Sequence, residues 1–433
     1  MLGCSQTPRD HSESTMTSDF FDMLTEQPVA AEEVPIVIRD TDVEESLDSS
    51  QSETPPAAMG YTRSYANEAA NSRSATALPE GNWVEDWRAE LAAGLSPLFV
   101  LYGGRAIVLP GPFQWQLFDI QGNAHGVGAL GMGQTVLDLE HGLFIGPGPT
   151  GVVTAWSLSD GSKIFSLLVA TDDAFRQALL ARRGERLLVV SVEYKAEPHG
   201  GHQPEESLVE VYELGPSEPV DEIGLLKWAR VEARLRRESP LLLAALHEES
   251  VVMASKDRIF VADWHLEVST TLEEAFIPLS MSLDEAGRIY LVVLQRKDDA
   301  PERRALWVID REGNRLLDVT LPAAASDAYA PPIVGYDHRA YLFQGDRVLS
   351  ISPDGGLRER VNAGGPVAGG LATSDGGLLV AAGGILSVFD SAGERRVLYV
   401  LDDDQWVTPP ALTSEGRLLI ASERYLYCLR AMP

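Results

Sequence analysis

The C-terminal stretch Pro409–Arg430, with the sequence PPALTSEGRLLIASERYLYCLR, decides the fold. It contains two apolar runs, Leu418–Ser422 and Tyr425–Arg430, and the turn Ser414–Gly416 precedes the first of them. Short apolar runs bounded by turn residues predict β-strands, and two runs separated by a short polar turn predict a hairpin. The sequence stops soon after the second run, at Pro433. We therefore expect the second strand to pair with a strand from elsewhere in the sequence.

An apolar strand like Leu418–Ser422 occurs eight times along the chain. These strands are Ala106–Pro110, Leu143–Pro147, Leu187–Ser191, Val251–Ser255, Ile289–Val293, Ala340–Gln344, Leu378–Ala382 and Leu418–Ser422. A second strand follows each of them, and then comes a turn that often ends in glycine, as in Asp310–Gly313. An Asp side chain can accept a hydrogen bond within such a turn, and glycine adopts the positive φ without strain. The sequence therefore predicts eight repeated units built from hairpins.

Other strands of a unit alternate between apolar and polar side chains. In Ala229–Leu235, Ala, Val and Leu occupy every second position, and Arg or Glu stands between them. Several of these residues also favour helices, but a period of two is typical of a half-buried strand. Eight units of four antiparallel strands predict an all-β, eight-bladed β-propeller over residues 81–433. The outer strand of the last blade is predicted to be Trp83–Leu91, because pairing the chain ends leaves no exposed edge.

Residues 1–80 differ in composition from the rest of the chain. They are rich in Ser, Thr, Glu, Ala and Pro, and most of their charges are acidic. Such a composition predicts a disordered acidic tail or tether. Within it, Leu2-Gly3-Cys4 resembles the end of a bacterial lipoprotein signal, although no basic and apolar regions precede it. Cys4 is therefore a lipidation candidate if the start codon lies upstream, and an ordinary thiol otherwise.

The charge of the chain excludes two classes of ligand. Its 433 residues carry a net charge of −29, whereas binding of nucleic acid or anionic lipid requires Lys and Arg. No run of about 18 apolar residues occurs, so we expect membrane contact only through a lipid anchor. The apolar fraction of 45% is sufficient for a large core. The two cysteines, Cys4 and Cys428, exclude a disulfide framework and a multi-cysteine zinc site.

The repeated strands, the glycine turns and the Leu2–Cys4 sequence together resemble the quinoprotein-type (PQQ-like) repeat propellers. Among these they resemble the lipoprotein propeller subunit of the outer-membrane β-barrel assembly machinery. The resemblance covers residues 83–430 and implies the fold, but it implies little about function, because the repeats encode architecture. Quinoprotein enzymes use a carboxylate base and a metal ion beside the quinone. No residue set in this sequence maps onto that site, so we expect no cofactor.

Two further motifs have structural explanations. Gly126–Gly131 has the letters of a dinucleotide-binding fingerprint, but it leads into Gln134–Leu139, a predicted strand and not a helix. We interpret it as a connection between blades. His199–His202 and the acidic residues around it are suitable ligands for a divalent metal. Their Pro and Gly content predicts an exposed loop instead, so we expect no metal site.

The candidate binding residues lie in the connection between the last two units, in the sequence Asp402-Asp403-Asp404-Gln405-Trp406. Three carboxylates beside an exposed aromatic ring suit a basic protein partner or a cation. The alternative is a solvated turn with a Trp that packs on a blade. The sequence thus predicts a monomeric, non-catalytic, protein-binding or scaffold propeller, with a quinone-dependent dehydrogenase as the alternative. We expect it in the periplasm or cell envelope if Cys4 is lipidated, and in the cytoplasm otherwise.

Overall fold

The computed structural model describes the chain from residue 73 to residue 432, with internal gaps. The described ranges are 73–131, 135–139, 141–148, 152–168, 175–183, 186–196, 202–214, 229–237, 241–247, 250–297, 300–322, 331–360, 363–390 and 392–432. Residues 1–72 of the predicted tail, and with them the lipidation candidate Cys4, lie outside these ranges.

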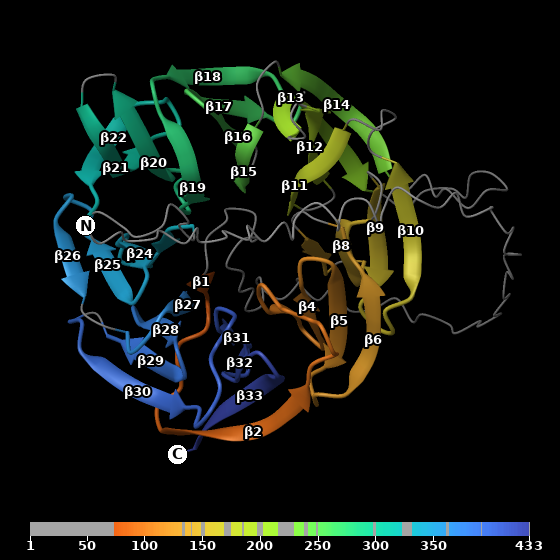
Figure 1. The fold of residues 1–433 in the computed structure, drawn as a ribbon, viewed down its shortest axis with the longest axis vertical. Helices are drawn as coiled ribbons and strands as arrows, with labels where there is room; N and C mark the ends of the chain where they lie inside the picture. Colours follow the sequence, from red (N-terminus) through yellow and green to blue (C-terminus); the bar gives the residue numbers. More distant parts are fainter. Residues whose placement is uncertain are drawn as a thin grey trace, which may run out of the picture. The chain divides into compact units, whose positions relative to one another are not determined.

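The described strands form eight sheets, which Figure 1 shows as the blades of a closed β-propeller. Each blade has four antiparallel strands in order from the centre of the ring to its rim. The predicted all-β, eight-bladed fold is therefore confirmed. Among the residues that the structure describes, no helix is long and apolar enough to cross a membrane.

The first four blades have the following bounds, from the innermost strand outward. Blade 1 contains β3 (Leu101–Gly103), β4 (Ala106–Pro110), β5 (Gln114–Asp119) and β6 (Ala124–Ala129). Blade 2 contains β7 (Val136–Asp138), β8 (Leu143–Pro147), β9 (Val152–Ser157) and β10 (Lys163–Leu168). Blade 3 contains β11 (Phe175–Arg183), β12 (Arg186–Ala196), β13 (His202–Leu214) and β14 (Ala229–Arg237). Blade 4 contains β15 (Leu241–His247), β16 (Ser250–Ser255), β17 (Arg258–Asp263) and β18 (Val268–Glu273).

The other four blades complete the ring in the same order. Blade 5 contains β19 (Ile277–Leu283), β20 (Ile289–Lys297), β21 (Ala300–Ile309) and β22 (Arg315–Thr320). Blade 6 contains β23 (Ile333–Val334), β24 (Ala340–Gln344), β25 (Arg347–Ile351) and β26 (Leu357–Arg360). Blade 7 contains β27 (Val367–Thr373), β28 (Leu378–Ala382), β29 (Ile385–Phe389) and β30 (Arg395–Val400). Blade 8 contains β31 (Ala411–Leu412), β32 (Leu418–Ala421), β33 (Tyr425–Met432) and β2 (Asn82–Glu90).

The eight apolar strands predicted from the repeats are the second strands of the eight blades, and the alternating segment that begins at Ala229 is β14. The interpretation of Gly126–Gly131 as a connection was wrong for its first four residues, because Gly126 and Gly128 lie in the outer strand β6, which ends at Ala129, and only Leu130 and Gly131 lie in the connection. There Gly128 packs so closely on the Trp115 indole ring that a Cβ atom would lie 2.6 Å from it. The glycines therefore serve blade packing.

The two ends of the propeller close the ring in blade 8, as predicted. Strand β2 pairs antiparallel with β33, so that an N-terminal strand forms the outer edge of the last blade. Trp87 lies opposite Cys428 in this pairing. Cys428 is fully buried, and burial raises the pKa of its thiol to about 12. The thiol therefore stays protonated and belongs to the core.

Contacts with the propeller begin before residue 81, the boundary predicted from composition. Strand β1 (Arg73–Ser74) pairs parallel with β27, as a fifth strand at the inner edge of blade 7. Leu78 is buried in the core between blades 7 and 8. Pro79 covers the turn of Gly416, where a Cβ atom would lie 2.5 Å from its ring.

The hydrophobic core is divided among the interfaces between neighbouring blades. Between blades 4 and 5, for example, Val252 and Ile259 pack with Leu291 and the fully buried Trp307. Phe276, from the connection between these blades, contacts Trp307 edge to face at 5.1 Å. Burial of this kind on both sides of each sheet holds the ring rigid.

The ring has two faces that differ in the segments that form them. One face, here called the turn face, carries the described turns from the first to the second strand and from the third to the fourth strand of a blade. Blade 8 has no turn of the second kind, because its fourth strand, β2, precedes blade 1 in the sequence. The other, here called the connection face, carries the turns from the second to the third strand and the connections between blades. This assignment follows from the antiparallel order of strands in every blade.

Candidate functional site

The predicted acidic site lies on the connection face, between β30 and β31. The side chains of Asp402 and Asp403 are exposed, whereas Asp404 is half-buried. Trp406 is only 3% exposed and packs edge to face against Tyr427, with 5.3 Å between ring centroids. Of the two arrangements that the sequence left open, the structure therefore has the one in which the Trp packs on a blade. The indole ring packs on a blade because burial of its apolar surface stabilises the fold more than exposure would.

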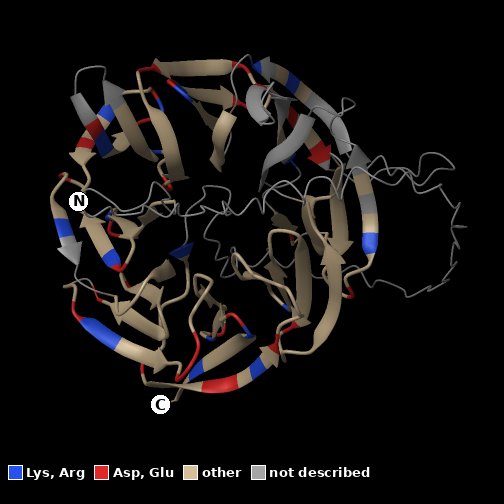
Figure 2. Ribbon diagram, in the orientation of Figure 1, with Lys and Arg blue, Asp and Glu red and all other residues tan. Residues whose placement is uncertain are grey.

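The backbone of this acidic connection is fixed to blade 7. The N–H groups of Leu401 and Trp406 donate to the carbonyls of Gly384 and Gly383, both at 2.8 Å. Asp402 and Asp403 thus project from a rigid loop. Acidic side chains are nevertheless not confined to this place, since Figure 2 shows acidic segments around the whole ring.

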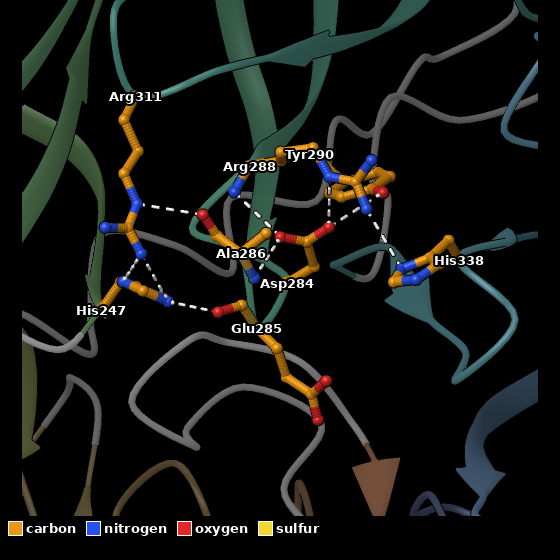
Figure 3. A network of polar contacts seen from close by, with 8 residues as sticks. All are labelled: His247, Asp284, Glu285, Ala286, Arg288, Tyr290, Arg311 and His338. Atoms are coloured by element: carbon orange, nitrogen blue, oxygen red, sulfur yellow. Dashed lines mark hydrogen bonds and ion pairs between the residues drawn. The ribbon is translucent and has the colours of Figure 1, made fainter.

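A second polar site, with more side-chain hydrogen bonds, lies on the turn face (Figure 3). It is formed where the first turns of blades 4, 5 and 6, those between the first and second strands of each blade, meet. Its centre is Asp284, whose buried carboxylate begins the turn from β19 to β20. One oxygen accepts the backbone N–H groups of Ala286 and Arg288, at 3.0 and 2.9 Å. The other accepts Nε of Arg288 at 2.6 Å and the hydroxyl of Tyr290 at 3.3 Å.

These contacts determine the protonation of the groups around Asp284. Burial and, after it, the charge of Asp284 raise the pKa of Tyr290 to about 12, so the phenol keeps the proton that it donates. Burial lowers the pKa of Arg288, but its hydrogen bond to Asp284 and the charges of Tyr290 and Asp284 together outweigh burial, and the net pKa is raised. The site therefore holds a fixed carboxylate and a fixed guanidinium cation.

Blade 4 contributes His247, at the end of β15. Its Nε2 atom lies 2.9 Å from the carbonyl oxygen of Glu285, and its Nδ1 atom lies 2.9 Å from Nη2 of Arg311. A carbonyl and a guanidinium are an acceptor and a donor respectively, so Nε2 carries the proton and Nδ1 accepts. Arg311 also donates from Nε to the carbonyl of Ala286 at 3.0 Å. Blades 4 and 5 are thus joined through one imidazole ring.

Blade 6 contributes His338, whose Nδ1 accepts a hydrogen bond from Nη2 of Arg288 at 3.1 Å. Its backbone has φ 58°, a left-handed conformation that is strained for a residue with a Cβ atom. Glycine occupies this place in the first turns of three other blades, with the same backbone hydrogen bond. The three glycines are Gly287, Gly376 and Gly416. His338 is the residue in this series that keeps an exposed side chain at a strained position.

The N-terminal arm reaches the same face. The guanidinium of Arg73 forms an ion pair with Glu285 and stacks over the ring of Tyr336, 3.6 Å from the centroid. Figure 3 shows the Glu285 side chain pointing away from Asp284 and its partners. Blades 5, 6 and 7 are therefore linked on this face by one arginine.

A small pocket of about 80 Å³ opens on the turn face between blades 5 and 6. Arg288 and His338 stand among its lining residues, and the rest of the lining is largely apolar. The lining also includes Leu316, which is 49% exposed, and the exposed Pro353. We call Arg288, Leu316, His338 and Pro353 the blade 5–6 rim.

The remaining predicted motif lies mostly outside the described residues. In the loop His199–His202, only His202 is described, as the first residue of β13. In the part of the chain that the structure describes, no group of three or more His, Cys, Asp or Glu side chains is arranged to hold a metal ion.

The sequence contains a signal for the blade 5–6 rim in the last residue of one repeated turn. Turns that end in glycine precede the second strands of blades 5, 7 and 8, and the blade 6 turn has His338 in that place. Aligning the turns by their place in the repeat would have marked His338 as unusual. The partners of His338 lie one blade away, so no short motif could have revealed them.

No family model and no curated protein matches this chain. Among solved structures, BamB from Moraxella catarrhalis aligns with a TM-score of 0.51 at 11% identity, over 80% of this chain and 99% of that chain. A europium-containing methanol dehydrogenase aligns with a TM-score of 0.56 at 9% identity, over 84% and 89% of the two chains. A computationally designed protein, Ika8, aligns with a TM-score of 0.51 at 13% identity, over 78% and 98%. At these identities the likeness concerns the fold alone, which is the eight-bladed propeller predicted from the repeats.

Proposed function

We propose that this chain is a non-catalytic, protein-binding propeller that contacts its partner through the blade 5–6 rim on the turn face. One observation carries the proposal: the half-exposed Leu316 lies beside the fixed donors Arg288 and His338 at the opening of an apolar pocket. A few residues in well-packed, desolvated places carry most of the energy of protein interfaces, and arginine is enriched among them.

The rigidity of the rim supports binding over a role in stability alone. Arg288 is held by Asp284 and His338, and both turns are fixed by backbone hydrogen bonds. Side chains that are already ordered lose little conformational entropy when a partner binds. A strained backbone such as that of His338 persists where the surrounding structure enforces it, and such positions cluster at functional sites.

A capture experiment tests this proposal. The immobilised full-length chain is compared with Leu316→Asp, which places a charge at the rim, and with Leu139→Asp as the matched control. Leu139 is also a half-exposed leucine on the turn face, but it lies in blade 2. We expect Leu316→Asp to capture at least tenfold less of a partner that the Leu139→Asp control still captures. Equal capture by both variants would move the binding site away from blades 5 and 6.

The alternative function is a quinone-dependent dehydrogenase, since the fold also occurs in a methanol dehydrogenase. Addition of the quinone to the purified chain should leave its absorbance and melting temperature unchanged if the proposal is right. Reduction of a dye in the presence of quinone and an alcohol or sugar would overturn it.

Asp402, Asp403 and Asp404 remain our candidate for a second contact, with a basic partner. Asp402 and Asp403 are exposed on a connection whose backbone is fixed. Replacing all three by Asn should weaken capture of such a partner, and the loss should be smaller at high salt, where exposed charges are screened.

We propose location in the cell envelope, with Cys4 as the lipidated residue of a precursor. The motif Leu2–Cys4 is the support for this proposal. Expression with the upstream sequence should give a membrane-bound protein that becomes soluble on Cys4→Ala. A mature chain that begins at Met1, measured by mass spectrometry, would contradict it.

A further inference from the structure

We infer that the pocket between blades 5 and 6 binds the C-terminal aliphatic residue of a partner polypeptide, with the side chain in the pocket and the carboxylate against Arg288 and His338. This inference rests on the proposed function and specifies which part of the partner is recognised. It is drawn from the walls of the pocket, its size, the polar groups at its opening and the strain at His338.

The walls select an aliphatic group. They are formed by strands of both blades, and their apolar members are Leu306, Val308, Leu317, Ala340 and Ile351. The side chains of Tyr290 and Ser352 also line the pocket, but the hydroxyl of Tyr290 is engaged with Asp284 and that of Ser352 with Asp354 and the carbonyl of Gly356. A polar group placed among these walls would lose its hydrogen bonds to water without replacement. An aliphatic group would gain contact area and lose nothing.

The size of the pocket restricts the aliphatic group further. The volume of about 80 Å³ is roughly half that of an apolar cavity of about 150 Å³ that holds benzene. The four carbon atoms of a Leu or Ile side chain fill such a space, whereas an indole or phenol ring exceeds it. The exposed rim residues Leu316 and Pro353 would cover the stem of the side chain and exclude water around it.

The polar groups at the opening require an acceptor. Arg288 can only donate hydrogen bonds. His338 accepts from Arg288 at Nδ1, so its Nε2 atom carries the proton and donates as well. A carboxylate is the strongest acceptor in polypeptides and pairs with arginine through two hydrogen bonds. An α-carboxylate shares its Cα atom with the side chain, so a C-terminal Leu or Ile presents both groups to one opening.

The strain at His338 indicates that its side chain has a role at the pocket. Glycine would adopt φ 58° without strain, and glycine is present in the corresponding turns of blades 5, 7 and 8. Within the described residues, the His338 side chain accepts a hydrogen bond from Arg288 through Nδ1. A donor aimed at a bound carboxylate explains why an imidazole stands at this position.

Binding of short peptides to the full-length chain tests the inference directly. The probes are N-acetyl-Ala-Ala-Leu with a free carboxylate, the same peptide as its C-terminal amide, and N-acetyl-Ala-Ala-Lys with a free carboxylate. We expect saturable binding of the first, measured by NMR titration, and at least tenfold weaker binding of the other two. Equal affinity for the acid and the amide would overturn the role of the carboxylate. Equal affinity for Leu and Lys would overturn the role of the pocket, and no binding of the first peptide would overturn both.

Three variants locate the binding on the molecule. His338→Gly removes the donor while suiting the backbone, and we expect it to weaken binding of the acid about tenfold. His338→Asn tolerates the same backbone and keeps an N–H donor, so it should recover part of the affinity. Leu316→Ala should weaken binding several-fold, and Leu139→Ala on blade 2 should leave it unchanged. Equal affinity of wild type and His338→Gly would overturn the assignment.

The peptide and capture experiments fail in distinguishable ways. If capture depends on Leu316 but the free peptide does not bind, the blade 5–6 rim is an interface and the inference about a C-terminal residue is wrong. If the peptide binds but capture is unaffected by Leu316→Asp, the pocket binds free carboxylates and the proposed function is wrong.

Discussion

The turn face at blades 4 to 6 and the acidic connection between blades 7 and 8 are both polar, but their side chains are held in opposite ways. Around Asp284 the side chains are fixed by one another, and the contacts pass from blade to blade through His247, Arg288 and His338. In the connection the backbone is fixed, while Asp402 and Asp403 extend into solvent. The first arrangement sets donor directions before a ligand arrives.

The difference bears on selectivity. Exposed carboxylates create a field that attracts many basic partners and weakens with salt. A fixed arginine and histidine beside an apolar pocket discriminate by shape and by hydrogen-bond direction. The turn face therefore suits recognition of one group, and the connection face suits steering.

The largest expected effect comes from removing β2, the outer strand of blade 8, which follows the acidic connection. A chain that begins at residue 93 lacks β2 and exposes the edge of β33, and it also loses Trp83 from the core around Trp406. We expect this chain to aggregate. A chain that begins at Arg73 keeps β1, Leu78 and β2 and should unfold at nearly the same temperature as the full chain. Equal stability of the two truncations, measured by calorimetry, would refute the closure.

Removing single carboxylates tests the comparison between the two regions. Asp284→Ala deletes a buried acceptor of four hydrogen bonds and leaves Arg288 without its carboxylate, so we expect a loss of about 3 kcal/mol of unfolding free energy. Asp403→Ala removes an exposed side chain and should change stability by less than about 0.5 kcal/mol. Urea unfolding measures both. Similar losses for the two variants would mean that the two regions do not differ in how their carboxylates contribute to stability.

The parts of the fold that follow from local pattern were predicted from the sequence. The eight second strands, the alternating β14 and the pairing of β2 with β33 each depend on apolar periodicity or on the need to cover an edge. The strand at Gly126–Ala129 was not predicted, because glycine is compatible with both strands and loops and its presence does not distinguish them. Its place was decided by contact of Gly128 with Trp115.

The candidate site was not predicted, for a different physical reason. His247, Asp284 and His338 are far apart in sequence and meet because neighbouring blades place equivalent turns side by side. The sequence left Trp406 either exposed or packed on a blade, and its contact with Tyr427 on another strand decides for packing. Local composition describes the backbone of a loop better than the direction of a single large side chain.

Acid titration tests a second carboxylate on the turn face. This is Asp119, which begins the turn from β5 to β6 in blade 1. Burial disfavours its charge, but hydrogen bonds from Asn123, His125 and the backbone outweigh burial and lower its pKa to about 2. A lowered folded pKa means stability that is complete above the unfolded pKa of 3.8 and is lost as the pH falls toward 2. We expect Asp119→Asn to cost up to about 2 kcal/mol at pH 6 and much less at pH 2. Equal losses at the two pH values in urea unfolding would contradict this assignment.

The smallest expected change in stability is that of His338→Gly. It is compared with Leu266→Gly, because both residues have a strained, positive φ but only Leu266 is buried in the core. Leu266 also has a positive φ of 61°, but its side chain is buried between blades 3 and 4, so Leu266→Gly should lose about 2 to 4 kcal/mol despite the relieved backbone. His338 is exposed, and His338→Gly relieves similar strain while losing one hydrogen bond to Arg288 and gaining unfolded-state entropy. These terms nearly cancel, and we expect a net change within about 1 kcal/mol of zero in urea unfolding. A loss for His338→Gly as large as that for Leu266→Gly would mean that the imidazole stabilises the turn, and its position at the pocket would then need no binding role.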